Sequence, residues 1–249
     1  MAIATGGSAR KRPSVRRGLR WIVGGAAFIG LVAGWAACHL TERVRTKERL
    51  PHADASPHPA HELGAPELQV EDHTCGFHSL SIVYRAHGLD PEQEQLRARL
   101  GVDVPAIPKD SSTTGTLHPD LLRVLRQDRF DSSFLDPDAE DTPATLERLT
   151  AAGRAALVLI QRAESGGLHW VAVSRSSVPG HVRVFDSLVS EPYDVRTREY
   201  LRERVLSVVT IEPDPGAGFA NPKSVYAEGI AEMWRVKQRL AARSPQSAR

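Results

Sequence analysis

The order of the hydrophobic patterns between residues 66 and 212 limits most strongly what this chain can fold into. Apolar residues at helical spacing come mainly first, in the stretches 75–87, 91–100, 118–127 and 142–152. Short apolar runs that are typical of strands come mainly later, at 130–135, 155–161, 168–175, 181–186 and 206–211. A further short helix is expected at 198–204, and Thr116 is expected to cap the helix at 118–127. This order predicts an α+β domain, in which helices pack on an antiparallel sheet.

A lone cysteine stands at the start of the first helical stretch. Cys75 precedes apolar residues at three- and four-residue spacing, and Gly88 ends the run. A thiol in the first turn of a helix lies near the positive end of the helix macrodipole, which favours the thiolate. Cys75 is therefore a candidate nucleophile, and the alternative is a buried structural cysteine.

Two later strands carry residues that would complete a catalytic set. The run 168–173 has His169 at its beginning, and the run 181–186 ends in Asp186. A cysteine nucleophile needs a base that takes the thiol proton and a third group that orients the imidazole. Adjacent antiparallel strands would bring His169 and Asp186 side by side, facing Cys75. The alternatives are a surface histidine and an aspartate that caps a turn.

These residues resemble those of the papain-like cysteine peptidases of the bacteriocin-processing family, which cut leader peptides after a double glycine. That family has Gln six residues ahead of Cys-Gly at a helix start, and Gln69 precedes Cys75 by six residues here. The family also has His followed by an aromatic residue and a hydrophobic strand, and then Asp sixteen or seventeen residues after the His. His169-Trp170 and Asp186 match that pattern. The resemblance covers roughly residues 66 to 212.

The resemblance implies a papain-like fold and a role for each matched residue. Cys75 would be the nucleophile, His169 the general base and acid, and Asp186 the group that orients the imidazole. Gln69 would donate to the oxyanion beside the Cys75 backbone N–H. Substrate binding would involve two neighbours of these residues, namely Gly76 and Trp170.

The chain departs from the family's usual pattern at three places. Thr74 replaces the usual Asp before the cysteine, Ser187 replaces the usual Pro after the orienting Asp, and Phe77-His78 replaces small apolar residues. The implied partner is a peptide or protein substrate, with a Gly-Gly leader as the leading candidate. Because well-known family members are fused to transporters, a transporter is also a candidate partner. The alternative function is a catalytically silent domain that binds a leader peptide for such a transporter.

The N-terminal segment has the pattern of a membrane anchor. Residues 1–20 are basic, and residues 21–38 contain no charge over a length that suits a transmembrane helix. More basic residues precede this run than follow it, which favours a cytoplasmic N-terminus and a catalytic domain outside the cytoplasm. The sequence thus predicts a single-pass membrane protein. The alternatives are a cleaved signal peptide and lipidation of Cys38. Residues 39–65 are rich in proline and are predicted to be a linker.

The C-terminal segment, 213–249, begins with a Pro/Gly-rich break and continues as an amphipathic helix from Val225 to Ala242. Its apolar stripe consists of Ile230, Met233, Trp234 and Leu240. We expect this helix to pack back on the domain. Because it is basic, docking to a partner or to a membrane surface is the alternative.

Composition excludes several other classes of protein. The formal net charge of +2 gives no electrostatic reason to expect nucleic-acid binding. The sequence has no Gly-rich phosphate loop and no zinc-type cysteine pairs, and two cysteines exclude a disulfide scaffold. A metal site made of His73, Cys75 and His78 is not expected, because three ligands so close in sequence do not easily reach one tetrahedral zinc ion and a second cysteine or a carboxylate is missing. No metal and no cofactor are predicted.

Overall fold

The computed structural model describes residues 62–103, 115–214 and 222–243, which all belong to one compact unit, Leu50–Arg249. The basic tail 1–20, the uncharged run 21–38 with Cys38, and the linker up to residue 61 lie outside the described residues. So do residues 104–114 and 215–221. None of the helices in the described ranges is long and apolar enough to span a membrane.

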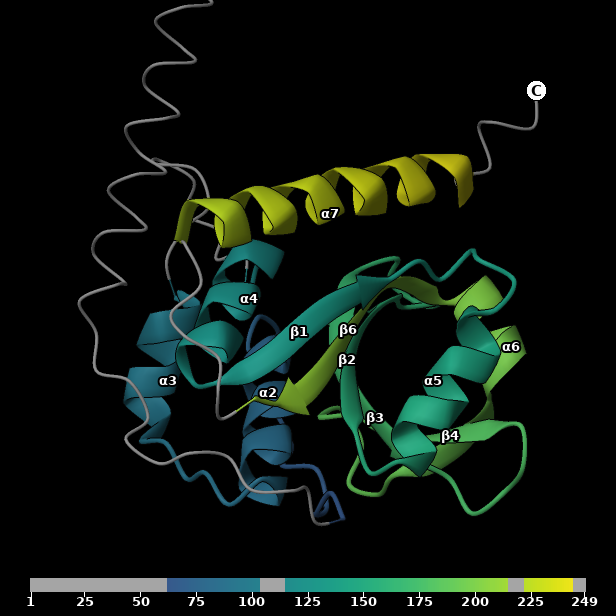
Figure 1. Ribbon diagram of the computed structural model, residues 1–249, viewed down its shortest axis with the longest axis horizontal. Helices are drawn as coiled ribbons and strands as arrows, with labels where there is room; N and C mark the ends of the chain where they lie inside the picture. The colour runs from purple at the N-terminus through teal and green to yellow at the C-terminus, as the bar shows by residue number, and fades with distance from the viewer. Residues whose placement is uncertain (1–61, 104–114, 215–221, 244–249) are drawn as a thin grey trace, which may run out of the picture. The chain divides into compact units, whose positions relative to one another are not determined.

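Within the described ranges, six strands form one antiparallel sheet in the order β1-β6-β2-β3-β4-β5 (Figure 1). The strands are β1 (Phe130–Leu135), β2 (Ala155–Gln161), β3 (Leu168–Arg175), β4 (His181–Phe185), β5 (Tyr193–Arg196) and β6 (Val205–Pro213). The prediction of an α+β fold on an antiparallel sheet is confirmed. β5 was not predicted, because it is a short edge strand whose residues are mostly exposed and lack an apolar run.

Helices cover both faces of the sheet. One face packs against α2 (Cys75–Ala86), α4 (His118–Gln127) and α7 (Pro222–Arg243), and the other against α5 (Thr142–Ala151) and α6 (Thr197–Glu203). α3 (Gln93–Leu100) packs against α2 and α4. β2 shows the division most clearly, because Leu157 and Leu159 enter the first core while Val158 and Ile160 enter the second. A strand that is covered on both faces reads as a continuous apolar run, as β2 does.

The start of α4 corrects the prediction that Thr116 caps this helix. The residue in the capping position is Leu117, and no side chain caps the helix there. Pro119 in the first turn favours the helix start instead, because its fixed φ suits a helix and its missing N–H is not needed there. The backbone carbonyl of Thr116 accepts a hydrogen bond from Trp170 Nε1 at 3.1 Å. Thr116 therefore connects this segment to β3.

The contact between α2 and β3 brings the predicted nucleophile to the predicted base. Ser79 Oγ in α2 donates to the backbone carbonyl of Trp170 in β3 at 3.0 Å. β3 in turn pairs with β4, in a register that places Ala172 opposite Phe185. Cys75 at the beginning of α2 thus meets the beginning of β3 and the end of β4.

Candidate active site

Cys75 is the first residue of α2 and is 6% exposed. The turn before it is closed by Thr74, whose backbone N–H and side-chain Oγ1 both donate to the carbonyl of Glu71, at 3.1 and 2.8 Å. Thr74 therefore holds the backbone that leads into the helix. Hydroxyl-to-backbone bonds of this kind stabilise tight turns. The sequence positions the thiol at a helix N-terminus, where the dipole favours a negative charge.

His169 and Asp186 come together from neighbouring strands, as the sequence predicted. His169 is the second residue of β3 and is 2% exposed, and Asp186 directly follows β4. Their Nε2 and Oδ1 atoms are 2.7 Å apart. The backbone N–H of Leu188 donates to the same carboxylate oxygen at 2.8 Å, and Tyr193 Oη donates to the other at 3.4 Å. The carboxylate is thus held in place from three directions.

The electrostatics of this pair favour an imidazolium. Burial by itself lowers the pKa of His169, but hydrogen bonds to Asp186 and to the Cys75 thiol, with the charges of both groups, raise it to about 9. For Asp186, burial acts to raise the pKa, whereas the hydrogen bonds from His169 and from the Leu188 N–H bring it below its ordinary value. The histidine is therefore charged at neutral pH beside the Asp186 carboxylate.

Gln69 lies beside the same turn and is held by Ser187. The backbone N–H of Gln69 donates to the carbonyl of Ser187 at 2.9 Å, and Ser187 Oγ donates to Gln69 Oε1 at 2.6 Å. Since Oε1 is taken by this bond, the amide nitrogen of Gln69 is left to act as the donor. Ser187 thus ties the segment before α2 to the loop that carries Asp186.

The two residues predicted to bind substrate lie in different environments. Trp170 is buried and lines a cavity that also includes Cys75. Gly76 is packed directly against Thr116, and a Cβ atom added to it would lie 2.5 Å from Thr116 Cβ. Gly76 is therefore required for close packing at the start of α2, and its role in substrate binding stays a prediction.

The cavity at Cys75 has a volume of about 660 Å³. Its wall is largely apolar, with Leu117, Leu159, Leu168 and Trp170 on one side and Met233, Val236 and Leu240 of α7 on the other. Polar groups at the same cavity come from Asp72, His73, Thr116, His118 and Lys237. Apolar walls with a few polar groups are typical of ligand sites.

Sequence reasoning did not find Ser187 as a partner of Gln69, Tyr193 as a partner of Asp186, or the part that α7 plays in the cavity. Ser187 and Tyr193 act through long-range hydrogen bonds that leave no local pattern. The departure from Asp-Pro to Asp186-Ser187 was the one available signal, since it placed a hydroxyl beside the orienting carboxylate.

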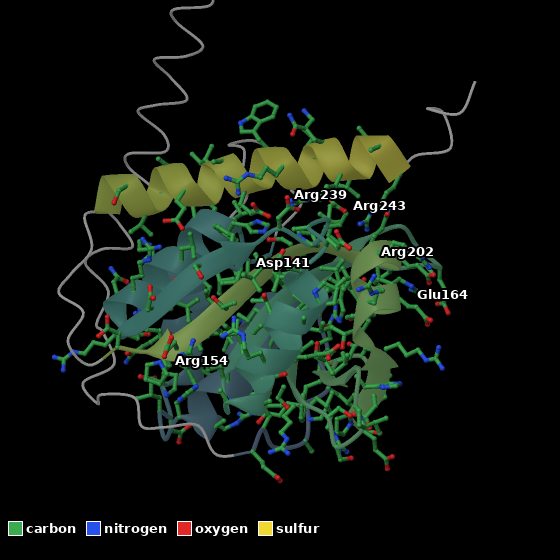
Figure 2. The ribbon with its side chains drawn as sticks, turned by 45° about the vertical axis from the view of Figure 1, so that its right-hand side comes forward. Asp141, Arg154, Glu164, Arg202, Arg239 and Arg243 are labelled. Atoms are coloured by element: carbon green, nitrogen blue, oxygen red, sulfur yellow. The ribbon has the colours of Figure 1, made fainter. Side chains whose placement is uncertain are left out.

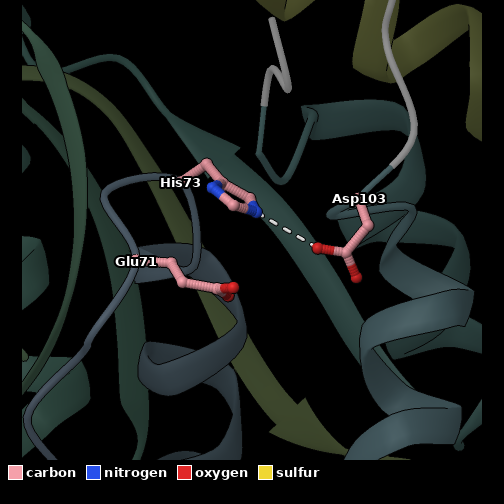
Figure 3. A group of neighbouring side chains, drawn as sticks. All are labelled: Glu71, His73 and Asp103. Atoms are coloured by element: carbon pink, nitrogen blue, oxygen red, sulfur yellow. Dashed lines mark hydrogen bonds and ion pairs between the residues drawn. The ribbon is translucent and has the colours of Figure 1, made fainter.

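One group in the described ranges has the spacing of metal ligands, and it lies close to Cys75 in sequence. Ligand atoms of Glu71, His73 and Asp103 lie within 4.8 Å of one another. His73 Nε2 and Asp103 Oδ1 are 3.1 Å apart, and a dashed line marks this hydrogen bond in Figure 3. Arg97 Nη2 bonds to both carboxylates, at 2.7 Å from Glu71 and 2.8 Å from Asp103. The guanidinium already supplies the positive charge that a metal ion would bring, so this cluster is an ion-pair network.

Comparisons with known proteins found similarity to solved structures but no match by sequence. No family model matches the sequence, and no curated protein matches it. The chain is similar in structure to a double glycine motif protease from an AMS/PCAT transporter, solved in complex with the leader peptide. The identity is 16%, the TM-score is 0.43, and the match covers 64% of this chain and 99% of the other. It is also similar to the peptidase domain of Streptococcus ComA, a bi-functional ABC transporter involved in a quorum sensing pathway. There the identity is 14%, the TM-score is 0.46, and 60% of this chain and 98% of the other are covered.

Proposed function

We propose that this chain is a cysteine peptidase that uses Cys75, His169 and Asp186. The observation that carries the proposal is the 2.7 Å contact between His169 Nε2 and Asp186 Oδ1, with Cys75 near enough to help raise the pKa of the same histidine. The thiol lies at a helix start, and the whole set is buried. A nucleophile, a base and an orienting group in this order are the parts that covalent peptide hydrolysis requires.

The geometry supports a definite division of labour. Because Asp186 takes Nε2 of His169, Nδ1 is the nitrogen that exchanges a proton with the thiol. The Cys75 sulfur attacks the carbonyl carbon of the scissile bond, and the carbonyl oxygen becomes an oxyanion. His169 then protonates the amine nitrogen, the C–N bond breaks, and a thioester remains. Water attacks the thioester while His169 takes its proton, which releases the acid and restores the sulfur.

The oxyanion would be held by two donors at the same end of α2. The first N–H groups of a helix have no acceptor within the helix, so the Cys75 N–H is suited to this role. The amide nitrogen of Gln69 is the second donor, oriented by the hydrogen bond from Ser187. Donors held in place before the reaction stabilise the developing charge without further reorganisation.

The substrate that we propose is a leader-type peptide with small residues, Gly-Gly or Gly-Ala, before the scissile bond. This part rests on the resemblance of the Gln69, Cys75, His169 and Asp186 pattern to the bacteriocin-processing peptidases. The uncharged run 21–38 supports attachment to a membrane, with the catalytic domain outside the cytoplasm and a transporter as a candidate partner.

The test combines thiol labelling with peptide hydrolysis by the full-length protein in detergent. Cys38→Ala serves as the background, because it leaves Cys75 as the single thiol. An iodoacetamide-type probe at pH 6 should label this background rapidly, since an ordinary thiol with a pKa near ~8.5 is only ~0.3% thiolate at that pH. His169→Ala should slow the labelling by up to about 100-fold. His181→Ala, a histidine on the adjacent strand, is the matched control and should leave the labelling unchanged.

Hydrolysis separates the two candidate functions. Cys75→Ala and His169→Ala should each abolish cleavage of a Gly-Gly peptide, and Asp186→Asn should reduce cleavage while the domain stays folded. Full activity of Cys75→Ala would refute the assignment. If the protein binds the peptide without cleaving it, the silent binding domain is the correct function. Cleavage only after bulky residues would support a peptidase function but refute the processing of Gly-Gly leaders.

A further inference from the structure

The C-terminal helix α7 is firmly docked on the part of the domain that carries the site. It lies across α4 (Figure 1), and Val225 and Val236 are buried in the same core as Cys75. Gly229 contacts Pro119 at the start of α4, where an added Cβ would lie 2.5 Å from Pro119 Cα. Two backbones can approach this closely only where one of them carries a glycine, here Gly229. α7 thus has a fixed position relative to the start of α4.

Ion pairs and a backbone hydrogen bond fix the second half of α7. Figure 2 shows Arg239 and Arg243 on the side of the helix that faces the rest of the domain. Arg239 bonds to Asp136 and Asp138 at 2.8 and 2.9 Å, and its Nη1 donates to the carbonyl of Leu206 at 2.7 Å. The buried Glu232 also accepts from Arg239, at 3.1 Å. A network of charge-assisted bonds holds a helix more firmly than isolated surface pairs do.

This fixed position makes α7 one wall of the cavity at Cys75. One face of the helix lines the cavity: Val236, Lys237 and Leu240 stand three, four and seven residues after Met233. Trp234 is directed elsewhere, since it is 60% exposed and does not line the cavity. The helix therefore contributes one defined face to the space in which the Cys75 thiol lies.

Two buried polar groups of the cavity lining have no hydrogen-bond partner among the described residues. They are Thr116 Oγ1 and His118 Nε2, in side chains that are 6% and 4% exposed. Leaving such groups unpaired is unfavourable, so a polar group of a ligand that reached them would be bound favourably. Burial, with the nearby charge of Arg239, lowers the pKa of His118 to about 3, so this imidazole is neutral near pH 7. It can then pair with an uncharged amide.

We propose that α7 forms one wall of a substrate subsite, in which an apolar side chain of the substrate peptide contacts Met233 and Leu240. The side chains of Thr116 and His118, which also line the cavity, add polar character beside this apolar wall. The inference rests on the proposed peptidase function, because Cys75 belongs to the same cavity. Its volume of about 660 Å³ lies within the ~300–1,000 Å³ of ordinary ligand pockets, so it has room for a short peptide segment. Met233 and Leu240 are thus specificity-determining residues that lie far in sequence from the catalytic set.

The experiment measures peptide binding by the full-length Cys75→Ala protein, so that the result does not depend on hydrolysis. The probes are fluorescein-labelled peptides that have Gly-Gly at the centre and serine at all other positions. In each peptide of the set, one of these serines is replaced by leucine. One position should bind at least about tenfold more tightly with leucine than with serine. At that position the leucine is then replaced by Ala, Val, Phe and Trp.

A smaller residue at position 233 should shift the preference to a larger peptide side chain, and a larger residue should shift it to a smaller one. Met233→Ala enlarges the cavity, so the optimum should move to Phe or Trp, with a gain of roughly tenfold over leucine. Met233→Trp fills the cavity, so the optimum should move to Ala. Trp234→Met, a change of similar size on the exposed face of the same helix, is the matched control and should leave the order of affinities unchanged.

Each other outcome overturns the inference. If Met233 variants keep the wild-type order of affinities while circular dichroism shows them folded, α7 is not a wall of the subsite. If no position prefers leucine, or no peptide binds, the cavity is not an apolar peptide subsite. Hydrolysis of Gly-Gly peptides by the wild-type protein is measured in parallel. If the wild-type protein cleaves these peptides but the Met233 variants keep its order of affinities, the peptidase function is supported and only the role of α7 is refuted.

Discussion

Replacing Ser187 by alanine should lower turnover without weakening substrate binding. The Ser187 hydroxyl is buried and donates to Gln69 Oε1 at 2.6 Å, and the Gln69 segment has no regular secondary structure of its own. Once the hydroxyl is removed, the side chain of Gln69 can rotate, although the backbone bond from Gln69 N–H to the Ser187 carbonyl remains. Gln69 then has to be oriented again in each catalytic cycle.

The magnitude follows from the energy of one hydrogen bond. A typical bond of this kind contributes about 0.5–1.5 kcal/mol, so the loss of orientation should reduce kcat by between about 2-fold and about 13-fold. Removing the donor itself in Gln69→Ala should cost more, roughly 100- to 1,000-fold, as for other oxyanion donors. KM should change little in either variant, because the interaction is made mainly in the transition state.

The assay is a double-mutant cycle on kcat for a cleavable peptide. In the Gln69→Ala background, Ser187→Ala should have almost no further effect, because the group that it positions is gone. Ser187→Thr, which keeps the hydroxyl, should restore most of the turnover. Ser133→Ala, which removes a hydroxyl that bonds to Thr210 at 2.8 Å on β1, controls for a general loss of stability. Fully additive effects of the Gln69 and Ser187 changes would refute this positioning role.

Three further predictions concern stability and location. His169→Gln should lower the free energy of unfolding by up to about 3 kcal/mol at pH 6 and by little above pH 9, measured by urea unfolding at both values. This pH dependence follows from the raised pKa of about 9 that His169 has in the folded state. The imidazolium stabilises the folded state fully below the unfolded pKa of ~6.5, and this stabilisation is lost as the pH rises through 9. Gly229→Ala should destabilise the protein by roughly 1–3 kcal/mol, because the new Cβ overlaps the Pro119 backbone and this outweighs the better helix propensity of alanine. Limited proteolysis should then release α7 sooner than in the wild type, and an unchanged rate of release would contradict the prediction. The uncharged run 21–38 should keep the intact chain in membranes through alkaline carbonate washing, and release of a soluble form that begins near residue 39 would show a cleaved signal instead.

The regular elements with strong local patterns were predictable from the sequence. The runs Ala155–Gln161 and Leu168–Arg175 became β2 and β3 with the predicted bounds, and the helical spacing at His118–Gln127 became α4. These patterns are local, because a strand covered on both faces needs a continuous apolar run and a helix needs one apolar stripe. The edge strand β5 lacked such a pattern and was missed.

The meeting of His169 and Asp186 was predictable from the sequence, but the contacts that support this pair were not. The positions of Cys75 at a helix start and of His169 and Asp186 on successive strands indicated that they would meet, because consecutive antiparallel strands are usually neighbours. In contrast, the bond from Ser187 to Gln69 and that from Tyr193 to Asp186 depend on how loops pass one another. Such contacts leave no periodic signal in the sequence.

The sequence by itself determined the α+β class, the order of helices and strands, and the residues that can perform the proposed reaction. Only the tertiary structure decided that Thr116 is used for packing against Gly76 and not as a helix cap, and that α7 lines the cavity at Cys75. The physical reason is the range of the interactions. Apolar periodicity and turn chemistry act over a few residues, whereas the walls of a cavity are built from elements brought together by the packing of the whole domain.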